Sequence, residues 1–367
     1  MKHKKNTTHP NHHQQQQHKI IIIIMNPINN IMATVALLLL GSLVTIIAAL
    51  SEPERLKEYE ARGYEWPLPE LKPNTPGWRN IFERRFKQVE ETIDDSNERY
   101  NAWMQTMTAA YLQPNFTENG WGLTRAPQDL VDALVKKVRD NVDTAPLEKD
   151  VDVIEGIDES SKPLFISNLD LNERVLRELK PMHEEWSGVE LVGQQAYGLR
   201  IYRNNSRLLM HVDKPRTHII SCILHIDHSE DSEPWPIVIE DFQGNTNEVI
   251  LESGDMLFYE SSKCFHGRPH TFKGSWYSSI FVHYYPVGWD TTGIEAETHY
   301  VVPPHWNKNP PAESDQDRLA MVGTSMKEPE CENVWCGLNN SVKWQGPGIA
   351  GEVITTGSKP TANEDEL

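Results

Sequence analysis

The chain has few cysteines and no excess of positive charge. Four Cys in 367 residues exclude a small scaffold that is held together by disulfides. Lys and Arg number 35 against 53 Asp and Glu, which gives a formal net charge of −18. Proteins that bind a phosphate backbone normally carry a basic face, so the sequence predicts no nucleic-acid partner.

Several catalytic and binding motifs are also missing from the sequence. It has no Gly-rich phosphate loop, no strand-to-helix elbow with a nucleophilic Ser, and no cysteine spacing of the zinc-binding type. Residues that form a core are nevertheless plentiful, because 38% of the chain is hydrophobic and it contains 11 Trp, 11 Tyr and 9 Phe. Such a chain can bury a sizeable core and is not disordered as a whole.

The N-terminal part has the pattern of a targeting segment, either a membrane anchor or a signal sequence. Residues 1–30 form a low-complexity tail that begins with His, Gln, Asn and Lys, and residues 31–50 contain no charged side chain. At about 1.5 Å per residue, this second segment is long enough to cross a bilayer core of roughly 30 Å. Lysines precede it and glutamates follow it, so the positive-inside rule predicts a cytosolic tail and a luminal remainder. The alternative is a cleaved signal segment, which delivers the same domain to the secretory lumen.

The C-terminus and three glycosylation sequons agree with this location. Residues 364–367 resemble a retrieval signal of the endoplasmic reticulum. Asn-x-Ser/Thr triplets begin at Asn115, Asn204 and Asn339. The sequence therefore predicts a glycoprotein of the endoplasmic reticulum membrane, with a single transmembrane helix and a luminal domain.

The four cysteines fall into two kinds. Cys331 and Cys336 are close in the sequence and predict a local disulfide in the oxidising lumen. Cys222 and Cys264 lie in predicted strands and are expected to be small buried hydrophobic residues.

Residues 51–187 predict a linker followed by a helical support region. The stretch 51–77 is rich in Pro and charge, and we interpret it as the linker. Beyond it, apolar residues recur at steps of three and four over three segments, 78–112, 127–142 and 171–180, the last of which is expected to end at Pro181.

From residue 188 the pattern changes to short β-rich runs. We expect eight strands, at 195–203, 207–213, 217–226, 237–241, 248–251, 255–260, 263–269 and 277–285. Strands at this spacing close into an antiparallel barrel or a double-sheet jelly roll. The predicted fold is therefore α+β with a mainly β core: a double-stranded β-helix (jelly roll) over residues 188–287, with supporting N-terminal helices, preceded by one transmembrane helix. Residues 288–367 are expected to be an irregular extension.

Three residues of this predicted core have the pattern of a metal site. His211 and Asp213 are two apart on one predicted strand, so their side chains point to the same side. His266 lies on a late strand, and early and late strands can be neighbours in a jelly roll. Two imidazoles and one carboxylate form the facial triad that leaves positions open on Fe(II).

The sequence around these residues resembles that of a known family. Tyr202, the run His211-Val212-Asp213-Lys214-Pro215, the run 221–226, Gly254-Asp255 and His266 together resemble the prolyl 4-hydroxylase-like branch of the Fe(II)/2-oxoglutarate-dependent dioxygenases. The resemblance covers residues 188–287. It implies that His211, Asp213 and His266 bind Fe(II), that Tyr202 lies beside 2-oxoglutarate, and that His225 contacts the same co-substrate.

One departure from the family concerns the partner of the far carboxylate of 2-oxoglutarate. The family places an Arg or Lys nine or ten residues after the distal His, where this chain has Ser275 and Trp276. A buried carboxylate without a cation is costly, so another cation is expected to replace it. Arg268 shares the inward face with His266, and we favour it over Lys273.

The resemblance implies an enzyme that hydroxylates prolyl or other residues of secretory-pathway proteins. Its cofactors would be Fe(II) and 2-oxoglutarate with ascorbate as reductant, and its partners O₂, a protein or peptide substrate, Pro-rich segments included, and the membrane through the N-terminal anchor. Two alternatives stay open: a non-catalytic, membrane-anchored β-barrel that binds a peptide or glycan, and a cupin-type metal enzyme that does not use 2-oxoglutarate. The other histidines near the core, His218, His228, His270 and His283, are expected to be surface or core residues.

Overall fold

The computed structural model describes residues 51–63, 66, 70–149, 161–290, 302–306, 324–326, 328, 330–337, 341–345 and 354–355. All of them belong to one of the two units of the chain, residues 50–367. The predicted tail 1–30, the predicted membrane segment 31–50, Asn339 and the retrieval-like end 364–367 lie outside the described residues. None of the helices within these ranges is long and apolar enough to span a membrane.

All eight strands predicted for the core are present. They are β3 (Leu191–Arg203), β4 (Leu208–Val212), β5 (Ile220–His228), β6 (Ile237–Glu240), β7 (Thr246–Ile250), β8 (Asp255–Tyr259), β9 (His266–Arg268) and β10 (Trp276–Pro286). The hairpin between β6 and β7 turns at Gly244, whose φ of 87° is a left-handed conformation that favours glycine.

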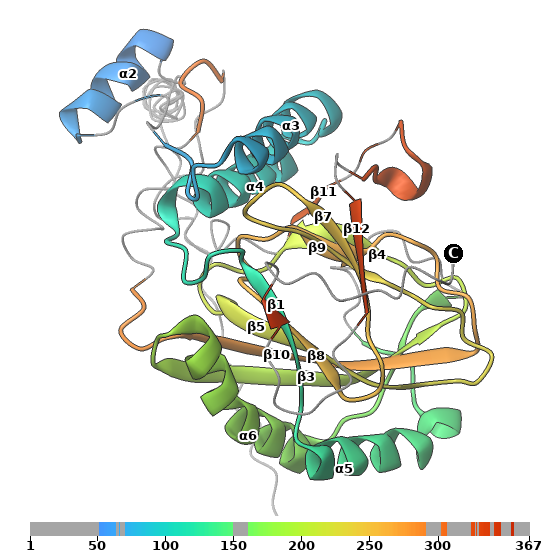
Figure 1. Ribbon diagram of the computed structural model, residues 1–367. Coiled ribbons are helices and arrows are strands. Elements are labelled where there is room, and N and C mark those ends of the chain that lie inside the picture. The colour runs from blue at the N-terminus through green and yellow to red at the C-terminus, as the bar shows by residue number, and fades with distance from the viewer. Residues whose placement is uncertain are drawn as a thin grey trace, which may run out of the picture. The chain divides into compact units, whose positions relative to one another are not determined.

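The strands form two facing sheets of a jelly-roll type (Figure 1). One sheet has the order β13-β1-β8-β5-β10-β3-β2, and the other has the order β11-β4-β9-β6-β7-β12. Five strands outside the predicted set take part: β1 (Trp121–Arg125), β2 (Leu164–Phe165), β11 (Thr324–Met326), β12 (Ser341–Gln345) and β13 (Ile354–Thr355). The inner faces meet, for example where the ring of Tyr259 on β8 lies 4.5 Å from that of His266 on β9.

Helices cover the outer faces of both sheets. Helices α5 (Gln128–Arg139) and α6 (Leu169–Ser187) lie on the seven-stranded sheet, where apolar residues of both helices pack on those of β5, β8 and β10. On the side of the other sheet lie α3 (Pro76–Thr92) and α4 (Ser96–Met107), whose Trp78, Phe82 and Trp103 share a core with Met210 and Phe265. The predicted supporting helices are thus confirmed, and Figure 1 shows the two pairs on opposite sides of the sheets.

The prediction of a plain linker at residues 51–77 is wrong. A helix, α2 (Glu52–Ala61), begins there, and the Glu54 carboxylate accepts a hydrogen bond from the Ser51 N–H at 2.8 Å. Its buried residues Arg55 and Tyr59 donate to backbone carbonyls of residues 302–306. The many charged residues of α2 gave no indication of this short buried side, because its contacts are with residues more than two hundred positions away in the sequence.

The single helix predicted over residues 78–112 is two helices. Helix α3 ends at Thr92, Ile93 is extended, and the Asp95 carboxylate accepts the N–H of Glu98 at 3.0 Å, as a helix N-cap does. A π-helical turn, η1 (Thr108–Leu112), follows α4. The apolar period continues across the break, so periodicity alone does not reveal it.

The predicted end of a helix at Pro181 is also wrong, because α6 continues to Ser187 and stops at Gly188 with a φ of 71°. Beyond the proline, His183 and Ser187 continue the buried stripe of Val175 and Leu179. Packing on the sheet therefore outweighs the cost of a proline inside a helix.

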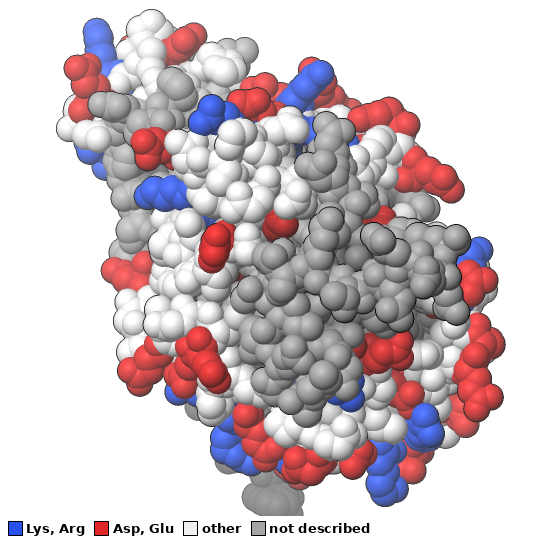
Figure 2. All heavy atoms as spheres, viewed as in Figure 1, with Lys and Arg blue, Asp and Glu red and all other residues white. Residues whose placement is uncertain are grey.

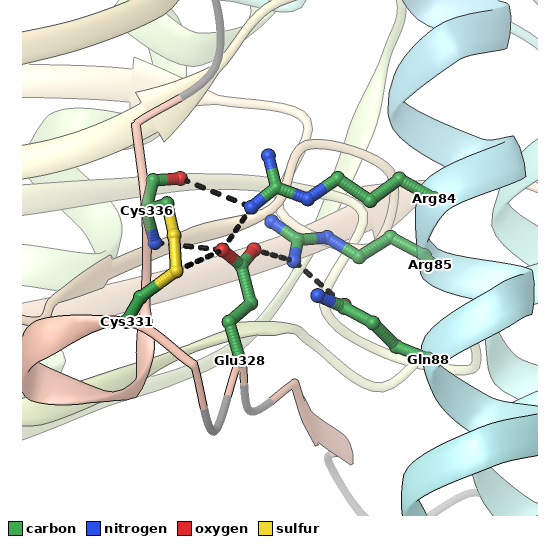
Figure 3. Close-up of a disulfide and its surroundings, with 6 residues drawn as sticks. All are labelled: Arg84, Arg85, Gln88, Glu328, Cys331 and Cys336. Carbon is green, nitrogen blue, oxygen red and sulfur yellow. Dashed lines mark hydrogen bonds and ion pairs between the residues drawn. A yellow bond between two sulfur atoms is a disulfide. The ribbon is translucent and has the colours of Figure 1, made fainter.

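The extension predicted to be irregular instead adds the edge strands β11, β12 and β13 to the two sheets. Between β11 and β12, the predicted disulfide between Cys331 and Cys336 is present, while Cys222 and Cys264 are free and buried, as expected. Figure 3 shows how Glu328 anchors this segment: its buried carboxylate accepts hydrogen bonds from Arg84 and Arg85 of α3 and from the N–H of Cys336. Arg85 also pairs with Glu240 of β6 at 2.7 Å.

Candidate metal centre

The structure brings His211, Asp213 and His266 together between the two sheets. One possible ligand atom from each residue lies within 4.8 Å of those of the other two. The Oδ1 atom of Asp213 is 3.6 Å from Nε2 of His211 and 3.8 Å from Nε2 of His266. Both imidazoles therefore point their Nε2 atoms at one carboxylate oxygen.

Backbone carbonyls fix the orientation of both imidazoles. Nδ1 of His211 lies 2.8 Å from the carbonyl of Leu209, and Nδ1 of His266 lies 2.9 Å from that of Cys264. A carbonyl only accepts, so each Nδ1 carries the proton and each Nε2 keeps its lone pair. Burial lowers the pKa of both imidazoles to about 4, with the His266 charge a second cause at His211. At neutral pH both are the neutral bases that metals bind.

A close approach of two backbones positions the pair. His211 and His266 face each other across β4 and β9. Between His266 and Arg268, a Cβ on Gly267 would lie 2.6 Å from the Leu209 carbonyl oxygen, so only glycine fits there. Helix α4 supports the end of β4, because the Gln105 amide donates to the carbonyls of Val212 and Asp213.

The donor set fits a divalent transition metal. Two neutral imidazoles and one carboxylate are the ligands of a facial Fe(II) site. The other oxygen of Asp213, Oδ2, is buried and has no hydrogen-bond partner in the described part of the chain, a cost that ligation of the carboxylate would offset. A second cluster, Glu328 with Cys331 and Cys336, is not such a site, because both sulfurs are in the disulfide.

A buried arginine, Arg268, lies two residues after His266 on β9. The Arg268 side chain is 2% exposed, and its guanidinium carbon is 4.6 Å from the ring centroids of both Trp235 and Tyr277. It donates to the Trp235 carbonyl and, at 3.1 Å, to the Tyr277 hydroxyl. No carboxylate of the described residues pairs with it. By contrast, Arg200 is neutralised by Glu148 at 2.7 Å.

Two of the other predicted co-substrate contacts lie around the same arginine. Tyr202 is fully buried, pairs with Tyr277 across β3 and β10, and has its ring 5.0 Å from Trp235. His225 stacks on Tyr277 at 4.1 Å, and burial together with the Arg268 charge lowers its pKa well below the usual value. Lys273, in contrast, is exposed on the turn before β10, so Arg268 is the candidate cation that the structure favours.

The structure shows where the side chains of Ser275 and Trp276 lie, at the two positions where the family has its cation. Ser275 is exposed, and Trp276 packs against the cluster on the outer face of the sheet. The next residue, Tyr277, faces Arg268, and burial raises its pKa, so the hydroxyl stays protonated. The inward-facing residue at this end of β10 is thus a tyrosine whose hydroxyl accepts a hydrogen bond from Arg268.

Sequence reasoning missed Tyr277, Ser279 and His283, all on β10. The hydroxyl of Ser279 is buried and has no partner among the residues described. His283, expected to be an ordinary surface or core residue, has its Nδ1 atom 3.8 Å from Oδ2 of Asp213. Steps of two along the predicted strand, starting at the inward residue 277, would have found all three positions.

Comparisons with known proteins give weak similarities only. No protein-family model matches the chain, and no curated protein matches it in sequence. Solved structures that resemble part of it include a prolyl-4-hydroxylase from Pseudomonas putida, 14% identical over 51% of this chain and 98% of that chain, with a TM-score of 0.35. A 2OG-Fe(II) oxygenase family oxidoreductase from Burkholderia pseudomallei is 13% identical over 52% and 92%, with a TM-score of 0.35.

A third structure is a prolyl hydroxylase from Trichoplax adhaerens in complex with a peptide fragment of the hypoxia inducible factor oxygen degradation domain. It is 9% identical over 52% of this chain and 91% of that chain, with a TM-score of 0.36. Because these TM-scores are low, we infer the function of this chain from its own side chains.

Proposed function

We propose that the protein is an Fe(II)- and 2-oxoglutarate-dependent oxygenase. The observation that supports this most is the pairing of two features between the sheets. His211, Asp213 and His266 offer two nitrogens and one oxygen within 4.8 Å of one another, and Arg268, on the same strand as His266, is a buried cation without an acid partner among the described residues. A dicarboxylate that chelates the metal would satisfy both.

Each of the chain's residues then has a defined task. His211, Asp213 and His266 hold Fe(II), and Arg268 pairs with the far carboxylate of 2-oxoglutarate. The Tyr277 hydroxyl accepts from Arg268 and can donate its own proton to that carboxylate, while Tyr202 and Trp235 keep water away from the pair. When bound, iron and 2-oxoglutarate supply the oxidation: one atom of O₂ enters a substrate C–H bond, the other enters succinate, and CO₂ leaves.

The proposed substrates are prolyl or other residues of secretory-pathway proteins, and the proposed location is the lumen of the endoplasmic reticulum. The N-terminal and C-terminal sequence signals support this location, and so does the disulfide between Cys331 and Cys336, since disulfides persist in oxidising compartments. Asn115 and Asn204 are both exposed. Acidic side chains lie between the basic ones on the face that Figure 2 shows, in line with the net charge of −18.

Turnover of 2-oxoglutarate by the purified full-length chain tests the proposal. The protein is incubated with Fe(II), ascorbate and 2-oxoglutarate, with and without a pool of Pro-rich peptides, and succinate is measured. We expect succinate that requires iron, increases with a substrate peptide and is absent from a His211→Ala variant. Iron-dependent oxidation of a substrate without succinate would favour the cupin alternative, and no activity without any binding of 2-oxoglutarate would favour the binding module.

A further inference from the structure

Of the three predicted ligands, Asp213 alone lies beyond the end of its strand. Strand β4 ends at Val212, whereas His266 begins β9. His211 lies within β4 and is paired on both sides, with His266 and with Ser325 of β11. Asp213 is outside these ladders, so another group must fix its main chain if the carboxylate is to keep its place beside the two imidazoles.

The side-chain amide of Gln105 bridges the peptide groups on either side of Asp213. Its Nε2 atom donates to the carbonyl of Val212 at 2.9 Å and to that of Asp213 at 3.2 Å. The Val212 carbonyl and the Asp213 N–H belong to one planar peptide group, and this N–H donates to the Ser261 carbonyl at 2.8 Å. The first peptide group is thus held at both ends and the second at its carbonyl, which restricts φ and ψ of Asp213 and hence the direction of its side chain.

The orientation of the Gln105 amide follows from its partners. Two carbonyls can only accept, so the nitrogen must face them. Gln105 is 1% exposed, and its Oε1 atom is buried without a partner among the described residues, which is a cost. An apolar side chain would avoid this cost but would leave both carbonyls without this donor. What the amide contributes is therefore its pair of bonds to the segment that carries Asp213.

We infer that Gln105 is a positioning residue for the metal. By holding the main chain on both sides of Asp213, it keeps the carboxylate directed at the two histidines. This inference rests on the proposed function, in which these three side chains bind Fe(II). Groups behind the ligands commonly change metal affinity by about 10- to 100-fold. Helix α4 thereby contributes to metal binding as well as to the core.

Co(II) binding tests the inference without turnover. For the full-length protein and its variants, the dissociation constant is measured by competition with a chromophoric chelator, the ligand-field spectrum is recorded, and thermal unfolding of the metal-free protein is followed. Gln105→Met keeps the length of the side chain but removes both donors. We expect it to weaken Co(II) binding about tenfold or more and to change the spectrum.

Gln88→Met on α3 is the matched control. Gln88 is also a buried glutamine, and its Oε1 atom accepts from Arg85 at 2.9 Å. Arg85 keeps its two carboxylate partners in this variant. We expect Gln88→Met to bind Co(II) with the affinity and spectrum of the wild type, even if it unfolds at a lower temperature. A spectrum that changes only in Gln105→Met separates a role at the metal from a general loss of helix packing.

Gln105→His carries the test if Gln105→Met does not fold. The imidazole keeps one N–H donor, which can hold only one of the two carbonyls. We therefore expect Co(II) binding that is weaker than in the wild type, together with a changed spectrum.

Wild-type affinity and spectrum in Gln105→Met or, should that variant not fold, in Gln105→His would contradict the inference and leave the proposed function standing. Equal losses of affinity in the Gln105 variant and in Gln88→Met would contradict it as well. A wild-type protein that binds Co(II) no better than His211→Ala would contradict the proposed function and, with it, this inference.

Discussion

Two buried arginines between the sheets differ in whether an acidic side chain balances their charge. Arg200 and Arg268 are both largely buried, but Arg200 has Glu148 as a partner and Arg268 has two neutral acceptors. A buried cation without an acid is costly unless a ligand supplies the charge. The contrast between these two arginines supports Arg268 as the one that would pair with a ligand. Its spacing from His266 already favoured it, and the structure adds that Arg200 has an acid partner and Arg268 has none among the described residues.

At His183 we expect a pH dependence of folding. Burial lowers the pKa of this imidazole from 6.5 to about 4, and its Nε2 has no partner within the described segments. Because the unfolded chain takes up the proton first, stability is lost as the pH falls from about 6.5 to about 4, by about 3 kcal/mol.

Urea unfolding of the wild type and of His183→Leu at a series of pH values measures this contribution. The variant should lose less stability over this pH range, since the other histidines are common to both proteins. Parallel curves for the two proteins would show that His183 does not titrate in this way.

The elements show what the sequence could predict. Short β-rich runs identified the eight core strands. The i, i+2 spacing put His211 beside Asp213 and His266 beside Arg268 on their predicted strands. The missed features depend on distant contacts: the buried side of α2, the passage of α6 through Pro181, and edge strands formed by the C-terminal segment. In the site, Tyr277 and His283 lie at steps of two along the predicted strand, but the sequence did not show that this face of β10 is the one that turns toward Arg268 and Asp213.

Gly267 should be intolerant of any side chain. A Cβ there would meet the backbone of β4 at Leu209 and separate the two strands that carry His211 and His266. We expect Gly267→Ala to destabilise the protein by about 1–3 kcal/mol and to weaken Co(II) binding.

Gly193→Ala on β3 is the matched control, because its Cβ would meet only side-chain atoms of Leu176. Thermal unfolding and Co(II) titration report both effects. Equal behaviour of the two variants would mean that the approach of β9 to β4 does not depend on glycine.

The C-terminal segment should depend on its buried carboxylate. Glu328→Gln removes the charge that faces Arg84 and Arg85 (Figure 3), and loss of one partner of a buried pair costs on the order of 3 kcal/mol. Glu332→Gln, at an exposed residue of the same segment, is the control. Denaturant unfolding should show a loss for Glu328→Gln alone, and a loss of similar size in both variants would contradict this role.

At the scale of the whole molecule, the terminal sequence signals and the two exposed sequons support the same proposed location, the lumen of the endoplasmic reticulum. Asn115 lies in the loop before β1, and Asn204 lies in the turn between β3 and β4. Oligosaccharyl transfer takes place only in the lumen, so glycans on these residues would report the topology that we propose.

Expression of the full chain in a eukaryotic cell tests this topology. We expect a membrane-bound product whose mobility increases after glycosidase treatment, and a smaller shift in Asn115→Gln and in Asn204→Gln. Deletion of residues 1–50 should abolish glycosylation. An unmodified full-length product in the cytosol would contradict the proposed location but not the proposed chemistry.

Anaerobic titration of the Fe(II)-loaded full-length protein with 2-oxoglutarate tests the central claim most directly. A 2-oxo acid that chelates Fe(II) gives a visible charge-transfer absorption, so one signal reports both the metal and the co-substrate. We predict a saturable band in the wild type and none in His211→Ala. In Arg268→Leu, we predict a band that needs about a hundredfold more 2-oxoglutarate. Absence of the band from the wild type, or an unchanged titration of Arg268→Leu, would contradict the account.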